Sequence, residues 1–321
     1  MLFGMDSLVT APFPLPLWSA QLPGWALARG RDLDDRDVAF AAGIALKSLD
    51  DLIRVEPPWL GCWRERLALK SAAVASRMLG RNEEEGALRD AVLLTASGDD
   101  PGPAGKLFLA TRMLARRSGP LRSPFIKELA ELFGIRWDDG LASIPDQVDF
   151  AIQSGRAAPF AVADLIAAIS AVRPDAEVLA LGLAEAVLAQ KLKWSKPVPL
   201  LLPERFGPAF RTIGGRGRVR PGEPAYSKAI CLTVVEGIEA ALRSGADIHR
   251  RATRLMAVAP KVRTKGADAV IQKLLNEDAV SASAPGSNLS RWAATRLFER
   301  LECFEAVREL SGRPSFRIFG L

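Results

Sequence analysis

The stretch that decides the fold is Ala267-Asp-Ala-Val-Ile-Gln-Lys-Leu-Leu-Asn-Glu-Asp-Ala-Val280. Its apolar residues recur at intervals of three and four, which is the pattern of an amphipathic helix. A turn-forming run at 281–288 follows, and Ser290 stands where it can cap a second helix whose apolar face ends at Phe304. The pattern predicts two packed helices joined by a short turn.

After residue 304 the apolar period changes from 3.6 to 2. Residues 306–310 and 315–319 then indicate two strands around Ser311-Gly-Arg-Pro314, which is typical of a hairpin. Helix, turn, helix and hairpin are the order of a winged helix, in which the second helix enters the major groove of DNA. We therefore predict that residues 261–321 form a winged helix-turn-helix domain with a small β-hairpin.

The chain before this stretch indicates a multi-helix body, so the expected fold class is mainly α. Ala and Leu dominate its composition, and both are strong helix formers. We expect the body to span residues 1–194. Residues 195–224 hold six prolines and five glycines and predict a basic linker or surface loop. Residues 225–260 predict connecting helices, and the sequence does not decide whether the helix is interrupted at 244–247.

The positive charge is concentrated in one region. Residues 205–265 hold thirteen Lys and Arg against four Asp and Glu, whereas residues 266–321 hold seven of each. A basic stretch of this kind favours a polyanion as partner, although a solvated arginine-rich surface explains it equally well.

We expect the partner to be double-stranded DNA and the protein to be a regulator. The second helix begins with Arg291, Thr295 and Arg296, which could reach base edges. The hairpin and a basic arm at residues 211–220 could contact phosphates. The candidate phosphate-contacting residues are Arg308, Arg313 and Arg317 of the hairpin and Arg216, Arg218 and Arg220 of the arm.

The neutral charge of residues 266–321 favours an alternative. Glu299, Glu302, Glu305 and Glu309 would repel phosphate if they faced DNA. In this alternative the protein is an interaction scaffold, and its winged helix docks a protein partner or a second copy of the chain. Trp292, on the exposed side of the second helix, fits either function.

No catalytic constellation is legible, so we do not expect an enzyme or a cofactor. The single histidine, His249, would have to serve any Ser-His-Asp or Cys-His arrangement, and its position favours a helix surface residue. Asp99 and Asp100 could bind a metal in a nuclease-like enzyme, which is a remote third alternative. Their place before Pro101-Gly-Pro103 favours capping of the next helix.

The cysteines and the apolar runs indicate a cytoplasmic protein. Cys62, Cys231 and Cys303 are odd in number and far apart, which favours buried thiols in a reducing compartment. The N-terminal residues carry Asp6 and a cluster of prolines and do not form a signal peptide, and no apolar run is long enough for a membrane span.

Several motifs resemble an uncharacterised alphaproteobacterial family of the rhizobial type, domain-of-unknown-function family 1403. The motifs are Pro57-Pro-Trp-Leu-Gly-Cys-Trp-Arg-Glu-Arg-Leu-Ala-Leu-Lys70, Gly98-Asp-Asp-Pro-Gly-Pro-Ala-Gly105, Ala184-Glu-Ala-Val-Leu-Ala-Gln190, Ala259-Pro-Lys-Val-Arg-Thr-Lys-Gly-Ala-Asp-Ala-Val-Ile271, Glu277-Asp-Ala-Val280 and Val307-Arg-Glu-Leu-Ser-Gly-Arg-Pro-Ser-Phe-Arg-Ile-Phe-Gly-Leu321. The last segment is also similar to the winged-helix ends of related rhizobial and Fic-domain proteins, but the Fic catalytic motif is absent. The resemblance implies no activity and supplies no catalytic residue.

Overall fold

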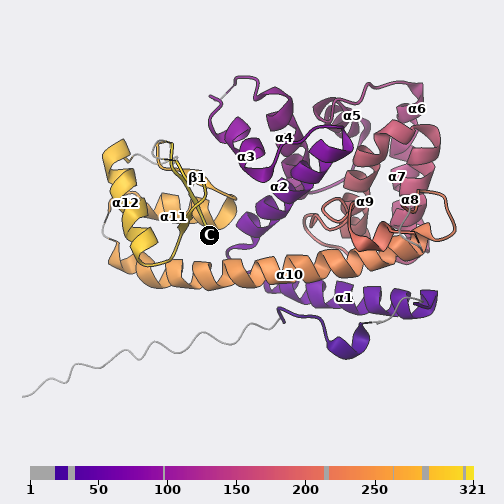
Figure 1. Ribbon diagram of the computed structural model, residues 1–321, viewed down its shortest axis with the longest axis horizontal. Helices are drawn as coiled ribbons and strands as arrows, with labels where there is room; N and C mark the ends of the chain where they lie inside the picture. Colours follow the sequence, from indigo (N-terminus) through magenta and orange to yellow (C-terminus); the bar gives the residue numbers. More distant parts are fainter. Residues whose placement is uncertain are drawn as a thin grey trace, which may run out of the picture.

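One long helix, α10 (Tyr226–Val258), joins the two parts of the molecule (Figure 1). Its 33 residues span about 50 Å at 1.5 Å per residue. It continues without interruption through residues 244–247, where the sequence allowed either a continuous helix or an interruption. The structure, a computed structural model, describes residues 19–27, 33–96, 98–212, 217–262, 264–283, 289–313 and 316–321.

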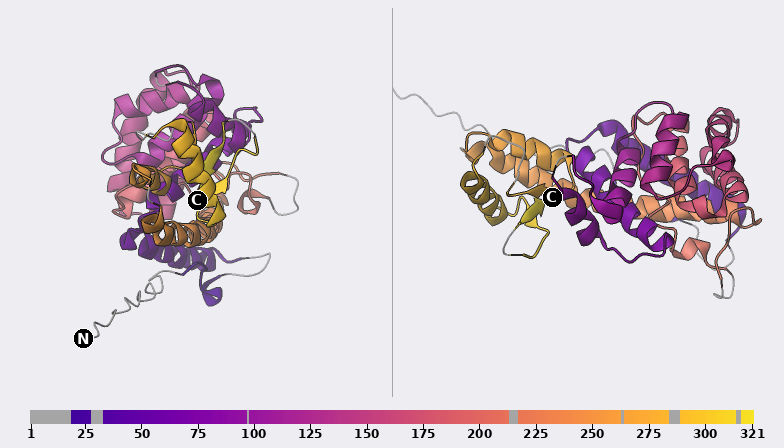
Figure 2. Two further views of the ribbon diagram at one scale, coloured as in Figure 1. Left: turned by 90° about the vertical axis from the view of Figure 1, so that its left-hand side faces the viewer. Right: turned by 90° about the horizontal axis from the view of Figure 1, so that it is seen from above.

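A helical body surrounds the first half of α10 (Figures 1 and 2). Its helices are α1 (Asp35–Val55), α2 (Leu60–Met78), α3 (Glu85–Leu93), α4 (Gly102–Arg116), α5 (Ser123–Leu132), α6 (Asp139–Ala142), α7 (Ile144–Gln153), α8 (Ala158–Val172) and α9 (Glu177–Lys191), with 3-10 turns at Gly24–Ala26, Pro174–Ala176, Pro208–Phe210 and Ala259–Lys261. Helix α1 packs along α10, α2 packs on α4, and α8 packs on α9. The predicted mainly α fold class is confirmed.

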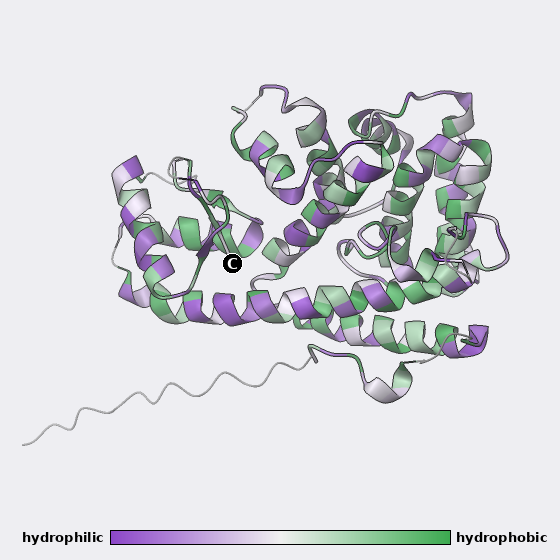
Figure 3. Cartoon of the chain, viewed as in Figure 1, coloured by the Kyte–Doolittle hydropathy of each residue, from purple (hydrophilic) through white to green (hydrophobic). Residues whose placement is uncertain are grey.

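Helix α9 forms the centre of the body. Every residue from Val178 to Ala189 is buried, including Glu185. A helix that is apolar on all sides has no face for solvent and therefore takes an interior position. Figure 3 shows hydrophobic residues gathered on α9 and the adjoining part of α10, whereas the end of α10 near α12 is more hydrophilic.

The first part of the predicted linker or surface loop, residues 197–202, is irregular but packed in the core, whereas Arg211 and Arg220 further along it are exposed. Leu200, Leu201 and Leu202 are at most 1% exposed. Their three backbone N–H groups donate to Oε1 of the buried Glu185 at 3.0, 2.9 and 3.0 Å. A Cβ at Gly237 of α10 would lie 2.4 Å from the carbonyl oxygen of Leu200, so only glycine allows this approach. The carboxylate satisfies backbone groups that would otherwise be buried without partners.

The C-terminal unit consists of α11 (Ala267–Asn276), β1 (Val280–Ser281), α12 (Arg291–Cys303), β2 (Arg308–Glu309) and β3 (Ile318–Gly320). The strands form an antiparallel sheet in the order β1-β3-β2. Val280 pairs with Phe319, and Arg308 pairs with Gly320. The two helices and the hairpin were predicted from the apolar pattern. Strand β1 was not predicted, because two residues are too few to reveal a period of two.

A buried carboxylate fastens the C-terminal unit to the body. Asp278, just after α11, is 3% exposed and accepts hydrogen bonds from Nε of Arg66 on α2 and from Nε of Arg89 on α3. The Arg89 bond measures 2.6 Å. Arg66 also donates through Nη2 to the backbone oxygens of Asp278 and Leu321, at 3.2 and 3.3 Å. These bonds join two body helices to the end of the small sheet where β1 begins and β3 finishes.

A second cluster of ion pairs lies beside the first. Glu65 of α2 is 2% exposed and pairs with Arg112 of α4 at 2.6 Å and with Arg116. Both arginines also pair with Glu277, the neighbour of Asp278, and the Arg116 contact measures 2.9 Å. The two acidic residues after α11 therefore engage arginines from α2, α3 and α4. Because Glu65 is buried, removal of its arginine partners would leave its charge without compensation.

The first prediction concerns Glu185→Ala. The substitution leaves three buried N–H groups without an acceptor, so we expect the free energy of unfolding to fall by at least about 3 kcal/mol. Urea denaturation measures the change. Glu128→Ala, at an exposed position on α5, is the matched control and should change stability by less than about 0.5 kcal/mol. Equal stability of the two variants would contradict the packing role of the carboxylate.

The second prediction concerns Asp278→Ala. Arg66 and Arg89 would keep their buried charges without a counter-ion, which costs about 3–5 kcal/mol when one partner of a buried pair is removed. We expect a loss of that size in urea denaturation, and faster limited proteolysis between α11 and β3. Asp149→Ala, at an exposed site on α7, is the control. A stable variant with unchanged proteolysis would show that the carboxylate does not hold the C-terminal unit.

The third prediction concerns pH. Burial alone would raise the pKa of Asp278, but the guanidinium groups of Arg66 and Arg89 outweigh it and hold that pKa below its ordinary range. The unfolded chain therefore binds the proton first as pH falls through about 3.9, and the stabilising contribution of the pair is progressively lost below that pH. Urea denaturation at a series of pH values from about 6 to 3 gives the free energy of unfolding at each pH. This free energy should fall more steeply with falling pH for the natural chain than for Asp278→Asn. Parallel curves would contradict this.

Candidate functional site

The outward face of α12 is the first candidate site. Ser290 caps the helix, and its Oγ accepts a hydrogen bond from the backbone N–H of Ala293 at 3.2 Å, as the sequence predicted. On the inner face, Phe298 stacks on Phe319 of β3 with a ring separation of 4.6 Å. Phe304, predicted to end this apolar face, is 39% exposed. The inner contacts fix the orientation of α12 and leave its opposite face toward solvent.

The predicted base-contacting residues lie together on that outward face. Arg291 and Arg296 are exposed, and Thr295 donates its hydroxyl to the backbone oxygen of Arg291 at 3.0 Å. The Arg296 guanidinium lies 4.8 Å from the ring centre of Trp292, which is 73% exposed. With Glu299 these residues line a shallow hollow. The face therefore offers two cationic donors and an aromatic ring to a partner.

Two of the three hairpin arginines form ion pairs within the molecule, which was not expected from the sequence. Arg313 pairs through Nη2 with Asp90 of α3 at 2.6 Å. Arg317 pairs with Glu309 at 2.7 Å and with Glu302 at 3.1 Å, and these partners raise the pKa of its guanidinium. Any contact of these two side chains with phosphate would have to replace an existing ion pair.

The arm residues lie far from α12. Arg216 is outside the described residues. Arg218 donates to the backbone oxygens of Arg205 and Phe206, at 3.4 and 3.1 Å, and Arg220 is exposed. This segment precedes the first turn of α10, whereas α12 lies beyond its last turn (Figure 1). About 50 Å of helix separates the two. The structure does not bring the arm and α12 onto one surface.

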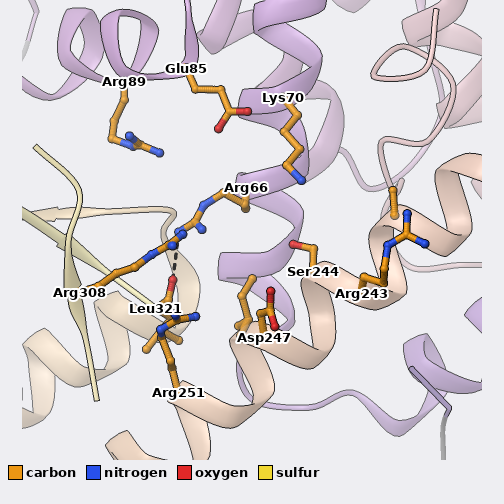
Figure 4. A pocket seen from close by; sticks show the side chains of 12 residues that line it. Arg66, Lys70, Glu85, Arg89, Arg243, Ser244, Asp247, Arg251, Arg308 and Leu321 are labelled. Atoms are coloured by element: carbon orange, nitrogen blue, oxygen red, sulfur yellow. Dashed lines mark hydrogen bonds between the residues drawn. The ribbon is translucent and has the colours of Figure 1, made fainter. Parts of the chain in front are cut away.

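Arg308, the third hairpin arginine, points into a pocket that the sequence did not predict. The pocket has a volume of about 490 Å³ and lies between α2, α3, α10 and β2. Figure 4 shows side chains from all four elements around it. Its basic side chains are Arg66, Lys70, Arg89, Arg243, Arg251 and Arg308, and its acidic side chains are Glu85 and Asp247.

The positive charges in this pocket are only partly neutralised. Arg66 and Arg89 share Asp278, and Asp247 pairs with Arg250 at 2.5 Å. Among the residues that the structure describes, Lys70, Arg243, Arg251 and Arg308 form no ion pair or side-chain hydrogen bond. Burial, and then the nearby guanidinium groups of Arg66 and Arg251, lower the pKa of Arg308. The second of these two effects reflects the positive charges that surround Arg308 in the pocket.

Part of the signal for this pocket is visible in the sequence. Arg66 and Lys70 are one helical turn apart on α2, and Arg243, Asp247 and Arg251 recur every four residues on α10. Spacing alone places each set on one helix face but cannot show that the two faces meet.

The residues weighed for enzymatic chemistry have structural contacts. His249 accepts a hydrogen bond from Nε1 of Trp59 at 3.2 Å through Nδ1. Asp100 accepts from the N–H of Gly102, at the start of α4, at 2.8 Å and pairs with Lys106. Cys303 is exposed, unlike the buried thiols of Cys62 and Cys231. Within the described ranges, no group of three or more His, Cys, Asp or Glu residues is arranged to hold a metal ion.

Comparison with known proteins identifies the family but no activity. Among the helices that the structure describes, none combines the length and apolar character needed to cross a membrane. No curated protein matches the chain. A family described as "Protein of unknown function (DUF1403)" matches residues 17–321, and the chain therefore belongs to this family.

Proposed function

We propose that the protein is a DNA-binding regulator whose C-terminal unit is a winged helix. The order of its elements carries the proposal. Helix α11, strand β1, helix α12 and the β2–β3 hairpin follow one another, and the sheet order is β1-β3-β2. In a winged helix the helix before the hairpin enters the major groove. Helix α12 holds that position, and its outward face is exposed.

The residues on α12 have suitable chemistry for this role. Arg291 and Arg296 are exposed guanidinium groups near the start of the helix, and arginine reads guanine through paired donors in the major groove. Thr295 lies between them and presents a methyl group as well as its hydroxyl. The neutral charge of residues 266–321 implies that few phosphates are contacted, so binding should depend on salt only moderately.

The hairpin has a different role in this proposal from the one expected from the sequence. Arg313 and Arg317 stabilise the hairpin and its contact with α3 through Asp90, Glu302 and Glu309. Contact with DNA is therefore assigned to α12.

A protein-docking function is the second candidate, because Trp292 and Arg296 stack on each other in the open. Tryptophan and arginine are the residue types most enriched at the energetic centres of protein interfaces. In that case the same face would bind a protein or a second copy of the chain, and the complex would withstand high salt.

The fourth prediction separates these functions. In fluorescence anisotropy at low salt with a mixed-sequence duplex, the Arg291→Ala/Arg296→Ala double variant should bind at least tenfold more weakly than the natural chain. Arg122→Ala, at an exposed position before α5, should bind as the natural chain does.

Two outcomes would count against DNA binding. One is the absence of any duplex binding at low salt. The other is equal affinity of the double variant and the natural chain. A complex that withstands high salt and is lost on Trp292→Ala, without duplex binding, would favour the docking function instead.

A further inference from the structure

We propose that the basic pocket between α2, α3, α10 and β2 binds a small phosphorylated molecule. This inference goes beyond the proposed function, because the pocket and the outward face of α12 share no residue. The ligand class is defined by its chemistry: an organic molecule that carries at least one phosphoryl group, such as a nucleoside diphosphate.

The charge of the pocket is the first argument. Its six basic side chains face two carboxylates in the lining, Glu85 and Asp247, and lie near two more, Asp278 and Glu204. Cations that lie together repel one another even where, like Arg243 and Arg308, they are exposed, and an anion with several oxygen atoms would offset that repulsion. Arginine binds carboxylate and phosphate alike through two parallel N–H donors, but a phosphoryl group offers three acceptor oxygens and can therefore be shared by several cations at once.

The arrangement of the cations is the second argument. Figure 4 shows Arg66, Arg251 and Arg308 at one end of the pocket, while Lys70 and Arg243 lie toward the other. Two groups of donors suit a ligand with more than one anionic group. Such a ligand would receive donors from α2, α10 and β2 together.

The size and walls of the pocket select a small organic ligand. A volume of about 490 Å³ lies in the range of sites for small molecules and cofactors. Ala240 and Ile248 add apolar surface, and Ser244 adds a hydroxyl, so the non-phosphate part of a ligand has contacts of its own. A DNA duplex as a whole is too large to enter the pocket, because its major groove, which is only part of its width, already measures about 12 Å.

The position of the pocket gives the ligand a structural effect. Arg308 belongs to the C-terminal unit, whereas Lys70, Arg243 and Arg251 belong to α2 and α10. A phosphoryl group between them would tie β2 to the two helices. A ligand that binds only the docked arrangement stabilises that arrangement. The bound ligand would therefore strengthen the attachment that Asp278 provides.

Calorimetric titration of the full chain at low ionic strength tests the proposal. The probes are pyrophosphate, ADP and citrate, and the last is a multivalent anion without phosphorus. We expect pyrophosphate and ADP to bind and to raise the melting temperature, and citrate to bind at least tenfold more weakly. Arg251→Gln and Arg308→Gln should each weaken binding of pyrophosphate at least tenfold, because each removes a charge-assisted hydrogen bond.

The controls keep a loss of binding distinct from a loss of folding. Arg122→Gln makes the same charge change far from the pocket and should leave the affinity for pyrophosphate within twofold. Since Arg251 and Arg308 pair with no described carboxylate, neither substitution should lower the melting temperature without ligand. The proposal is overturned if neither pyrophosphate nor ADP binds, if citrate binds as tightly as pyrophosphate, or if the pocket variants bind as the natural chain does. Competition between pyrophosphate and a duplex for one site would also overturn it.

Discussion

The carboxylate of Asp278 occupies the point where the two parts of the molecule meet. It lies between the guanidinium groups of Arg66 and Arg89, out of contact with solvent. A Cβ at Gly320 would lie 2.6 Å from the backbone oxygen of Asp278, so strand β3 must come this close to the same point. The ion pairs therefore fix the sheet against α2 and α3. They also set Arg308 of β2 at the edge of the pocket, while the stacking of Phe298 on Phe319 orients α12 on the sheet.

The basic side chains of the protein lie in three different environments. The arginines around Asp278 are buried and paired, those around Glu277 are paired but more exposed, and both sets hold the C-terminal unit in place. In the hairpin they are paired as well, through Asp90 and Glu309. On α12 and at four positions in the pocket, by contrast, the cations form no ion pair among the described residues. Formal net charge alone gave no means of distinguishing paired arginines from available ones, because pairing depends on tertiary contacts.

Local features were predictable and long-range ones were not. The apolar stripes and the Ser290 cap predicted α11 and α12, because both signals lie within one turn of the residues they describe. The burial of Leu200–Leu202 depends on Glu185, fifteen or more residues away, and the prolines and glycines around it indicated a loop. The pocket was missed because its cations come from four elements, and only the folded chain brings them together.

Hydrogen exchange measured by mass spectrometry, with and without a short duplex at low salt, tests the central assignment most directly. It reports on every segment of the same sample, including both ends of α10. We expect slower exchange in peptides from α12 and unchanged exchange in residues 217–220, at the far end of the molecule. Slower exchange at residues 217–220 together with unchanged exchange in α12 would contradict the assignment of DNA binding to α12.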